Sequence, residues 1–449
     1  MTILDVYLEA VSDPIGKLSA ATDGTMSFAY TTNDLPHPVS MSMPIREEPY
    51  GDVVTRGYFS NLLFENEMRD QVMQRHGIAE RDIVGLLYHL GADCPGAISC
   101  VPEGSTPAKR PGRLDVDYSA LDGAPVLPEA LSSVTDPLPV GASLAEIMTS
   151  LRDHRRLPPE SEDPSPLAGV QGKIALTRLP DGRLGLPVPG SGSPTTHILK
   201  VPRAAAMTSV RREHLATRLM AKAQDHPVAE TCVLGEGDLQ GLLVARFDRR
   251  LEGAEVHRVH QEDFCQALGF GHWLKYERNG EEGRAFTADA IGHLLDSTRV
   301  PAKARQAFFE ITLVNLLLGN SDNHAKNHAL LYTASKPELA PAYDVDPVLL
   351  DDVTHEMSFR IGDARVADDI TVEDLDRFLK ALGGRSFGKP QQRRVASIIK
   401  TLVKAADALP RPAGKGLCDV IRQQAYHLSG NLALGLDVPE FDAVPVNRP

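Results

Sequence analysis

The chain has 449 residues, of which 42% are hydrophobic and 24% charged, and its formal net charge is −13. These values are typical of a globular protein, and the length predicts two or three domains because single cores rarely exceed about 300 residues. The negative charge excludes a general attraction of the whole surface to nucleic-acid phosphates.

Cysteine usage and the pattern of apolar residues predict the compartment. The five cysteines are widely spaced and form no Cys-x-x-Cys pair, which argues against a disulfide framework and against a zinc site. Asp5 and Glu9 lie where a signal peptide would need an apolar core. No apolar run approaches the length of a membrane span. We therefore expect a cytoplasmic protein that makes no membrane contact.

Residues 1–110 are predicted to form an α+β module. Strand-like stretches at 3–11 and 26–30 are punctuated by turn residues, which indicates a small antiparallel sheet. Helical patterns follow at 57–75 and 82–90. The module contains no cluster of reactive side chains, so we expect it to bind or position another group.

Residues 111–164 are predicted to be largely a connector. The stretch 101–166 holds 11 of the 33 prolines, and proline at this density interrupts both helices and strand ladders. One helix is expected near 143–154.

The next segment, 165–250, is predicted to form a nucleotide-binding lobe. Ala168-Gly-Val-Gln-Gly-Lys173 precedes a β-hairpin with strands at 174–179 and 183–188, and kinases cover the phosphates of ATP with a glycine-bearing loop of this kind. A Walker A loop is excluded, because only two residues separate the glycines and Ile174 stands where the Mg²⁺-binding hydroxyl belongs.

A strand at 196–201 carries a lysine on an otherwise apolar face. Lys200 shares that face with Ile198, and a cation there requires a partner or a ligand unless it reaches water at an edge. A helix at 209–224 follows, with Glu213 in its first turn. Kinases use a strand lysine and a glutamate of the next helix to orient the α and β phosphates.

Residues 251–449 are predicted to be mostly helical and to carry the chemistry. Helices are expected at 261–268, 286–295, 372–382, 393–408 and 417–428. An apolar helix also ends at Gly319-Asn320, and Asp322, Asn327 and Asp344 follow it in an order that suits phosphoryl transfer. One aspartate can orient the acceptor hydroxyl, while an asparagine and a second aspartate supply oxygen ligands for Mg²⁺.

Together these motifs resemble one family, the HipA kinases, which are toxins of type II toxin–antitoxin modules. The resemblance spans nearly the whole chain and implies an α+β fold: a two-lobed protein-kinase-like core with an N-terminal α+β module and a mostly helical C-terminal lobe. The matching pieces, in family order, are SNLLFE (60–65), GADCPGA (91–97), AGVQGK (168–173), TTHILKVP (195–202), Glu213, VARFDR (244–249), QEDFCQ (261–266), KYE (275–277), GNSDNHAKN (319–327) and PAYD (341–344).

The resemblance implies a role for each matched residue. Asp322 would be the catalytic aspartate, and Asn327 with Asp344 would hold Mg²⁺. The other matched residues would form the ATP site: Gly169, Val170, Gln171 and Lys173 in the loop, Lys200 on the phosphates with Glu213 as its partner, the backbone of Ala245 to Phe247 along adenine, Gln261 and Tyr343 on the wall, His324 near the γ-phosphate, and Lys326.

The resemblance also implies partners, and the chain departs from the family pattern at one position. Family members pair with a small helix-turn-helix antitoxin, HipB, that binds operator DNA, and they phosphorylate aminoacyl-tRNA synthetases. They commonly phosphorylate a serine of their own two positions before the glycine loop, where this chain has Pro166. Ser165 is the one hydroxyl left close to the loop, so it is the predicted autophosphorylation site.

Three other functions are compatible with parts of this pattern. A small-molecule kinase of the aminoglycoside or choline type also uses Asp-x₄-Asn, but it usually places a histidine where this chain has Asn320. A catalytically vestigial, DNA-tethered co-repressor would be expected to lack at least one of four residues, and all four are present: Lys200, Asp322, Asn327 and Asp344. A metal-dependent phosphohydrolase would need more ligands than His324, His328 and Asp344.

Overall fold

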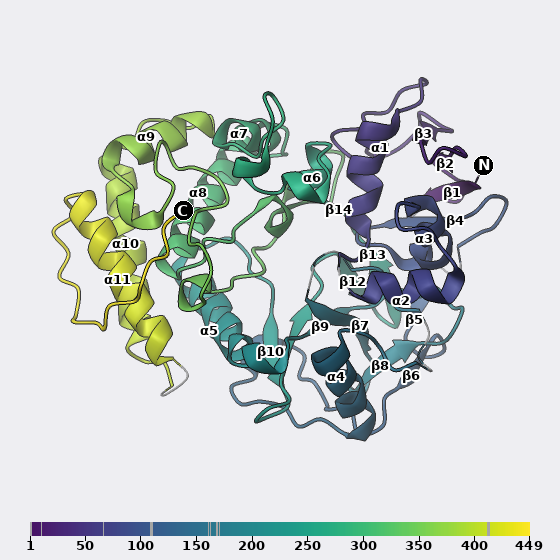
Figure 1. Cartoon of the computed structure of the whole chain (residues 1–449), viewed down its shortest axis with the longest axis horizontal. Coiled ribbons are helices and arrows are strands. Elements are labelled where there is room, and N and C mark those ends of the chain that lie inside the picture. The colour runs from purple at the N-terminus through teal and green to yellow at the C-terminus, as the bar shows by residue number, and fades with distance from the viewer. Residues whose placement is uncertain are drawn as a thin grey trace. The chain divides into compact units, whose positions relative to one another are not determined.

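The computed structural model describes every residue except 1, 10, 66, 108–110, 160, 162, 168, 170 and 411–413. Val170 of the predicted nucleotide loop therefore lies outside the described residues, as does Ala168. The backbone forms two compact units (Figure 1): unit 1 comprises 1–210, 230–272 and 330–335, and unit 2 comprises 211–229, 273–329 and 336–449. The domain boundaries expected from the sequence stay a prediction.

Unit 1 begins with a four-stranded antiparallel sheet in the order β3-β2-β1-β4. Alternating side chains of the first strand, Leu4, Val6 and Leu8, are buried in the core, as expected for a sheet with one covered face. The elements of this region are β1 (Thr2–Leu8), β2 (Gly16–Ala20), β3 (Met26–Tyr30), α1 (Asp52–Phe59), η1 (Ser60–Leu62), α2 (Glu67–His76), α3 (Ile83–Leu90), η2 (Gly91–Asp93) and β4 (Ile98–Pro102). The predicted antiparallel sheet and the helices after it are confirmed.

A second sheet of unit 1 has six strands in the order β10-β11-β9-β7-β8-β6. Helix α4 packs on β7 and β9, and this helix confirms the one predicted at 143–154. The elements are β6 (Tyr118–Ala120), η3 (Leu131–Ser133), α4 (Ala142–His154), β7 (Gly172–Arg178), β8 (Leu184–Pro187), β9 (His197–Val201), η4 (Ala204–Ala206), β10 (Thr231–Leu234) and β11 (Gly241–Ala245). The predicted hairpin and the lysine-bearing strand are therefore present.

The helix predicted at 261–268 is wrong in its first half, which is a strand. Residues 260–263 alternate between buried and half-buried positions, a period of two that defines a strand. Asp263 then caps a short helix through a reciprocal pair of hydrogen bonds with Gln266. The remaining elements of unit 1 are β5 (Gly112–Arg113), β12 (Arg249–Glu252), β13 (Glu255–Arg258), β14 (His260–Asp263), α6 (Phe264–Ala267), η5 (His272–Leu274) and β15 (Ala329–Tyr332), the last two of which extend into unit 2.

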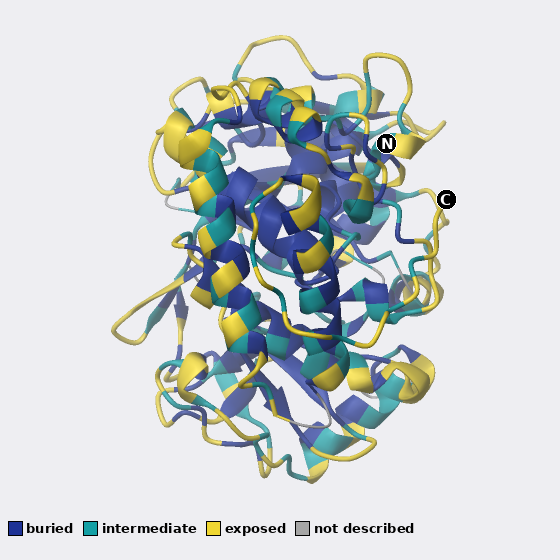
Figure 2. Cartoon of the chain, turned by 90° about the vertical axis from the view of Figure 1, so that its left-hand side faces the viewer, coloured by how far each residue is buried: buried dark blue, intermediate teal, exposed yellow. Residues whose placement is uncertain are grey.

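Unit 2 is mostly helical, as the sequence predicts. Its central helix α8 (Pro301–Leu317) is buried on nearly all sides from Ala307 onward, whereas α10 (Lys389–Ala406) buries one side only. Figure 2 shows surface helices with exposed residues along one side and buried residues along the other. The other elements are α5 (Thr208–Ala223, which begins in unit 1), η6 (Glu277–Asn279), α7 (Ala288–Asp296), η7 (Ala325–Asn327), β16 (Glu338–Leu339), η8 (Val348–Leu350), η9 (Ala367–Asp369), α9 (Val372–Ala381) and α11 (Lys415–Asn431).

The sheets of unit 1 and the helices of unit 2 confirm the predicted α+β class with a helical C-terminal lobe. Within the described part of the chain, every helix is too short or too polar to cross a lipid bilayer.

Candidate functional site

The loop that carries Asp322 begins where α8 ends. Gly319 adopts a left-handed conformation with φ of 74°, as predicted for the end of this helix. A Cβ atom there would lie 2.6 Å from Val420 and 2.9 Å from Leu349, so the close packing also requires glycine. We call residues 320–327 the catalytic loop, because it contains the predicted catalytic residues.

Asn320 ties this loop to two other segments. Its Nδ2 donates to Asn315 Oδ1 of α8 at 2.9 Å and to the backbone oxygen of Asp344 at 3.3 Å. Its Oδ1 accepts a hydrogen bond from the backbone N–H of Asp322 at 3.1 Å. Only 2% of Asn320 is exposed, so one buried amide links the helix end, Asp322 and Asp344.

Asp322 and Asn327 are held together within the loop. Asn327 Nδ2 donates to the backbone oxygen of Asp322 at 2.9 Å, which leaves the Asn327 side-chain oxygen for another partner. The Tyr276 hydroxyl donates to Asp322 Oδ1 at 2.8 Å. Burial raises the pKa of Asp322, whereas the Tyr276 hydrogen bond opposes that rise.

His324 is a neutral imidazole inside the same loop. Burial lowers its pKa to about 3, and its ring meets the Tyr276 ring edge-on, with centroids 5.3 Å apart. Its Nδ1 is buried and has no hydrogen-bond partner among the described residues. A buried polar atom of this kind favours a ligand or an ordered water, which agrees with the predicted place of His324 near a phosphate.

A hydrogen bond connects Tyr343 to the catalytic loop at Lys326, and Tyr343 is followed by Asp344. The Tyr343 hydroxyl donates to the backbone oxygen of Lys326 at 2.7 Å. Asp344 has a φ of 60°, a left-handed conformation that costs free energy for any residue except glycine and is tolerated best by Asn and Asp. Strained backbone is concentrated at functional sites, so the strain supports a functional role for Asp344.

Glu213 lies in unit 2, and its charge acts on Asp346, a residue that the sequence did not indicate. Burial and the charge of Glu213 raise the pKa of Asp346 to about 7. Lys200 belongs to unit 1, so the predicted pairing of Lys200 with Glu213 stays a prediction.

Unit 1 places two lysines of the predicted ATP site side by side. Lys173 of β7 lies directly opposite Lys200 of β9 in the antiparallel ladder, so both side chains project from the same face. Lys173 Nζ lies close to Gly169, where a Cβ atom would be only 2.8 Å away. Contact of these two lysines with the phosphates of ATP stays a prediction.

The other predicted nucleotide residues of unit 1 lie on neighbouring segments. Gln171, Ala245, Phe247 and Gln261 are half-buried, and Gln261 Nε2 lies 3.5 Å from Asp248 Oδ2. Asp248 in turn accepts hydrogen bonds from Arg246 and Arg249. The arrangement keeps these groups accessible to a ligand, and their contact with adenine stays a prediction.

Oxygen donors in unit 2 fit the predicted Mg²⁺. Asn327 and Asp344 supply an amide oxygen and a carboxylate, which are hard ligands. Among the described residues, no three His, Cys, Asp or Glu side chains gather as a metal-binding group. Two protein ligands suit Mg²⁺ that completes its shell with phosphate oxygens and water, and their role as Mg²⁺ ligands stays a prediction.

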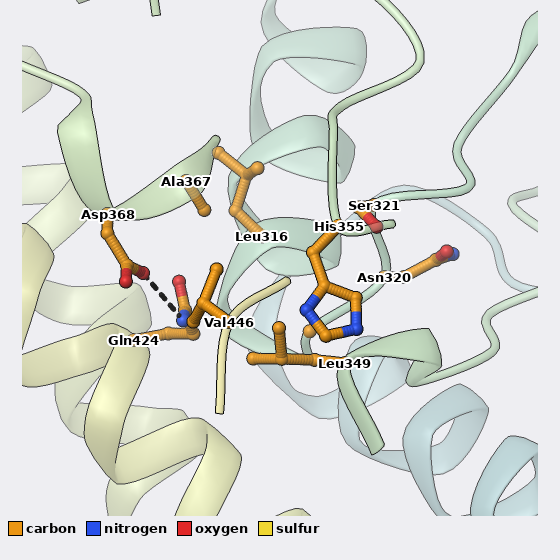
Figure 3. Close-up of a pocket in the computed structure, with 10 residues that line it drawn as sticks. Leu316, Asn320, Ser321, Leu349, His355, Ala367, Asp368, Gln424 and Val446 are labelled. Carbon is orange, nitrogen blue, oxygen red and sulfur yellow. Dashed lines mark hydrogen bonds between the residues drawn. The ribbon is translucent and has the colours of Figure 1, made fainter. Parts of the chain in front are cut away.

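A small pocket lies behind the first residues of the catalytic loop (Figure 3). His355 projects into this region, and both of its ring nitrogens are engaged, Nε2 with the Asp351 backbone oxygen and Nδ1 with the Asn447 backbone N–H. Gln424 donates to Asp368 at 3.0 Å. The lining residues are Leu316, Gly319, Asn320, Ser321, Leu349, His355, Ala367, Asp368, Gln424 and Val446. The start of the catalytic loop and the C-terminal segment therefore both contribute to the lining of this pocket.

Sequence reasoning missed two residues of this site, Asn320 and Tyr276. The sequence patterns place Asn320 at the end of a helix and within the GNSDNHAKN piece but assign it no contact, although two residues before Asp322 is the spacing at which an Asx side chain can accept that N–H. Tyr276 lies 46 positions before Asp322. The only signal for it was the KYE piece of the family resemblance.

Comparisons with known proteins agree with this arrangement. The family models for the HipA N-terminal domain and the HipA-like C-terminal domain match residues 4–101 and 165–409. The chain is 32% identical over 398 residues to "Putative kinase Y4mE" of Sinorhizobium fredii, covering 87% of this chain and 88% of the relative. It is 30% identical to the serine/threonine-protein kinase toxin HipA of Shewanella oneidensis, covering 82% and 81% of the two chains.

A solved structure matches nearly the whole chain. It is the complex of Shewanella oneidensis HipA with HipB and operator DNA, which is 25% identical with a TM-score of 0.73 and covers 95% of this chain and 96% of the other. Both domain models, the curated relatives and this structure point to one family: the chain belongs to the HipA family and is a homologue of kinases.

Proposed function

We propose that this chain is an ATP-dependent serine/threonine protein kinase and the toxin of a HipA/HipB-type toxin–antitoxin module. The observation that carries the proposal is the buried amide of Asn320, which connects the Asp322 backbone N–H to the Asp344 backbone oxygen. Phosphoryl transfer depends on positioning more than on covalent chemistry, and this amide positions a base and a metal ligand relative to each other.

Each residue has a defined task in this proposal. Asp322 orients the acceptor hydroxyl and accepts its proton, and Lys200 and Lys173 bind the phosphates of ATP. Asn327 and Asp344 would hold Mg²⁺, which when bound neutralises charge on the phosphates. Neutral His324 can donate one hydrogen bond to a phosphate oxygen.

The proposal extends to partners and compartment. The matched Shewanella structure contains HipA, HipB and operator DNA, so we infer a HipB-like helix-turn-helix antitoxin for this chain and contact with operator DNA through it. A protein of translation, such as an aminoacyl-tRNA synthetase, is the proposed target by family resemblance. Five free cysteines, four of them buried, fit a reducing cytoplasm.

The test is an Asp322→Asn variant incubated with Mg²⁺–ATP and a generic acceptor protein such as casein. Loss of a catalytic acid–base group typically costs about 10²- to 10⁴-fold, so transfer should fall in that range while ATP affinity, measured by calorimetry, is retained. Asp289→Asn on the exposed side of α7 is the matched control. Near-normal transfer by Asp322→Asn would refute the catalytic assignment, and phosphate found on an aminoglycoside or choline, with none on protein, would support the small-molecule alternative.

A further inference from the structure

The three residues Lys275, Tyr276 and Glu277, which we call the KYE segment, are attached to both ends of the catalytic loop. Lys275 accepts at its backbone oxygen a hydrogen bond from the Ala325 N–H at 3.1 Å. The Glu277 N–H donates to the Ser358 backbone oxygen at 2.8 Å. Ser358 in turn holds the Ser321 oxygen through its N–H and its hydroxyl, at 3.1 and 3.0 Å.

Tyr276, the middle residue, is aimed at the predicted base. Its hydroxyl donates to Asp322 Oδ1 at 2.8 Å. Its ring is held from two directions, by the Arg278 guanidinium 4.0 Å from the ring centroid and by the His324 ring at 5.3 Å. The backbone bonds of its neighbours and these ring contacts fix the position of the hydroxyl more firmly than a single surface hydrogen bond could.

A carboxylate base needs this kind of support. The last torsion of an aspartate side chain is broad and has no sharp rotamer preference, so an unrestrained Asp322 could turn either oxygen towards the acceptor or away from it. A donor fixed on Oδ1 selects one orientation. Misplacement of a reacting group by about 1 Å can cost about 100-fold in rate.

We propose that Tyr276 is a positioning residue of the phosphoryl-transfer reaction: its hydroxyl holds one oxygen of Asp322 so that the carboxylate is presented to the acceptor hydroxyl. The inference rests on the proposed kinase function and adds to it a residue outside the Asp322, Asn327 and Asp344 set. The KYE segment thereby acquires a physical role, because its flanking bonds keep Tyr276 in register with the loop.

The first experiment separates orientation from binding. In the full chain, Tyr276→Phe removes one oxygen atom and retains the ring contacts. We expect kcat for ADP release in the presence of Mg²⁺–ATP and casein to fall about 10- to 100-fold, with KM for ATP and the melting temperature unchanged. Tyr426→Phe is the matched control, because Tyr426 of α11 is 59% exposed and should keep the wild-type kcat.

The outcomes distinguish this inference from the proposed function. Wild-type kcat in Tyr276→Phe together with loss in Asp322→Asn would overturn the role of Tyr276 alone, whereas no Asp322-dependent activity in the wild-type chain would overturn the proposed function. A parallel loss of ATP affinity or of melting temperature would show that Tyr276 supports structure instead of orientation.

A second measurement needs no activity at all. Crystal structures of the wild-type chain and of Tyr276→Phe should differ in the Asp322 carboxylate, which we expect in one orientation in the wild type and in more than one in the variant. A single, unchanged carboxylate orientation in Tyr276→Phe would overturn the inference whatever the kinetics show.

Discussion

Ser165 donates its hydroxyl hydrogen to Asp93 Oδ2 at 2.9 Å, and this bond attaches the segment before the glycine loop to the N-terminal module. Burial acts to raise the pKa of Asp93, but the charges of Arg249 and Arg258 lower it below its usual value. Gly169 lies further along the same segment, and its backbone oxygen accepts a hydrogen bond from the Glu65 N–H of the N-terminal module at 3.3 Å. Hydrogen bonds to the N-terminal module therefore hold the stretch that leads into the predicted nucleotide loop.

The first prediction is that self-inactivating phosphorylation falls on Ser165. A phosphate on Ser165 would add nearly two negative charges beside the Asp93 carboxylate and would remove the hydrogen bond between the two residues. Like-charge repulsion would then displace the segment from the N-terminal module. Ser165→Ala should retain ATP binding and prolong activity. Mass spectrometry after incubation with Mg²⁺–ATP checks the site, with Ser161→Ala as control. A stoichiometric phosphate elsewhere, or none, would contradict the prediction.

The second prediction concerns the metal. Asp344→Ala should weaken binding of Mg²⁺–ATP far more than binding of metal-free ATP, because it removes the carboxylate predicted to bind Mg²⁺ directly. Alanine also fits the left-handed backbone at 344 poorly, so Asp344→Asn is the matched variant, since asparagine tolerates that conformation. Calorimetry that shows equal losses with and without Mg²⁺ in both variants would argue against a ligand role.

The third prediction is a pH dependence of stability in unit 1. His37 stacks on His260 with ring centroids 5.0 Å apart, and burial lowers the pKa of His37 and brings that of His260 down to about 3. The unfolded chain binds protons at these groups below about pH 6.5, whereas the folded chain binds them only at lower pH. Their contribution is therefore complete above pH 6.5 and is lost as the pH falls towards the folded pKa values.

The measurement compares slopes between variants. The pKa of the nearby Glu262 is raised to about 7, so its contribution is lost as the pH rises and partly masks the histidine effect in the wild type. His37→Gln should reduce the loss of unfolding free energy between pH 7 and 5 by up to about 1.4 kcal/mol per pH unit. The exposed His293→Gln is the control, and equal slopes in all three proteins would be evidence against buried neutral histidines.

Local patterns predicted the elements well and the contacts between them poorly. Helix α8 and its end at Gly319 follow from an apolar run and one glycine, and strand β9 follows from alternation around Lys200. The prediction of a helix at 261–268 was wrong because four residues of strand lead directly into one helical turn. At this length the periodicity of a strand cannot be told apart from that of a helix.

Long-range hydrogen bonds left no local signal in the sequence. The contacts of Tyr276 with Asp322 and of Ser165 with Asp93 join positions 46 and 72 residues apart. Which side chains meet across such separations depends on tertiary packing, which no periodicity of the chain encodes. That Asp322, Asn327 and Asp344 lie in one connected region was predictable, because the first two share one loop and Asn320 connects that loop to Asp344. Their catalytic and metal-binding roles stay predictions.

The fourth prediction concerns DNA. The net charge of −13 gives the chain no general attraction to phosphates, so the chain alone should bind operator DNA weakly, and a HipB-like antitoxin should supply the affinity. Gel-shift titrations at two salt concentrations, with and without a HipB-like antitoxin, test this. Tight, salt-sensitive binding by the chain alone would contradict it.

The fifth prediction is that Asn320 supports both stability and catalysis. Asn320→Ala removes three hydrogen bonds, one buried and two partly buried, and leaves Asn315 Oδ1 and the Asp322 N–H without their partner. An unsatisfied buried polar group costs about 1–3 kcal/mol, so the free energy of unfolding should fall by at least that amount.

Asn320→Asp separates the two roles of this residue. Aspartate can still accept from the Asp322 N–H at nearly the same geometry, but an ionised carboxylate cannot donate to Asn315 or to the Asp344 oxygen. We expect phosphoryl transfer to fall more than ATP affinity in this variant, because the link between Asp322 and Asp344 is lost while the lysines of unit 1 are unchanged. Asn33→Asp, at an exposed position of unit 1, should leave both quantities as in the wild type. Wild-type transfer in Asn320→Asp would show that the amide link does not position the two aspartates.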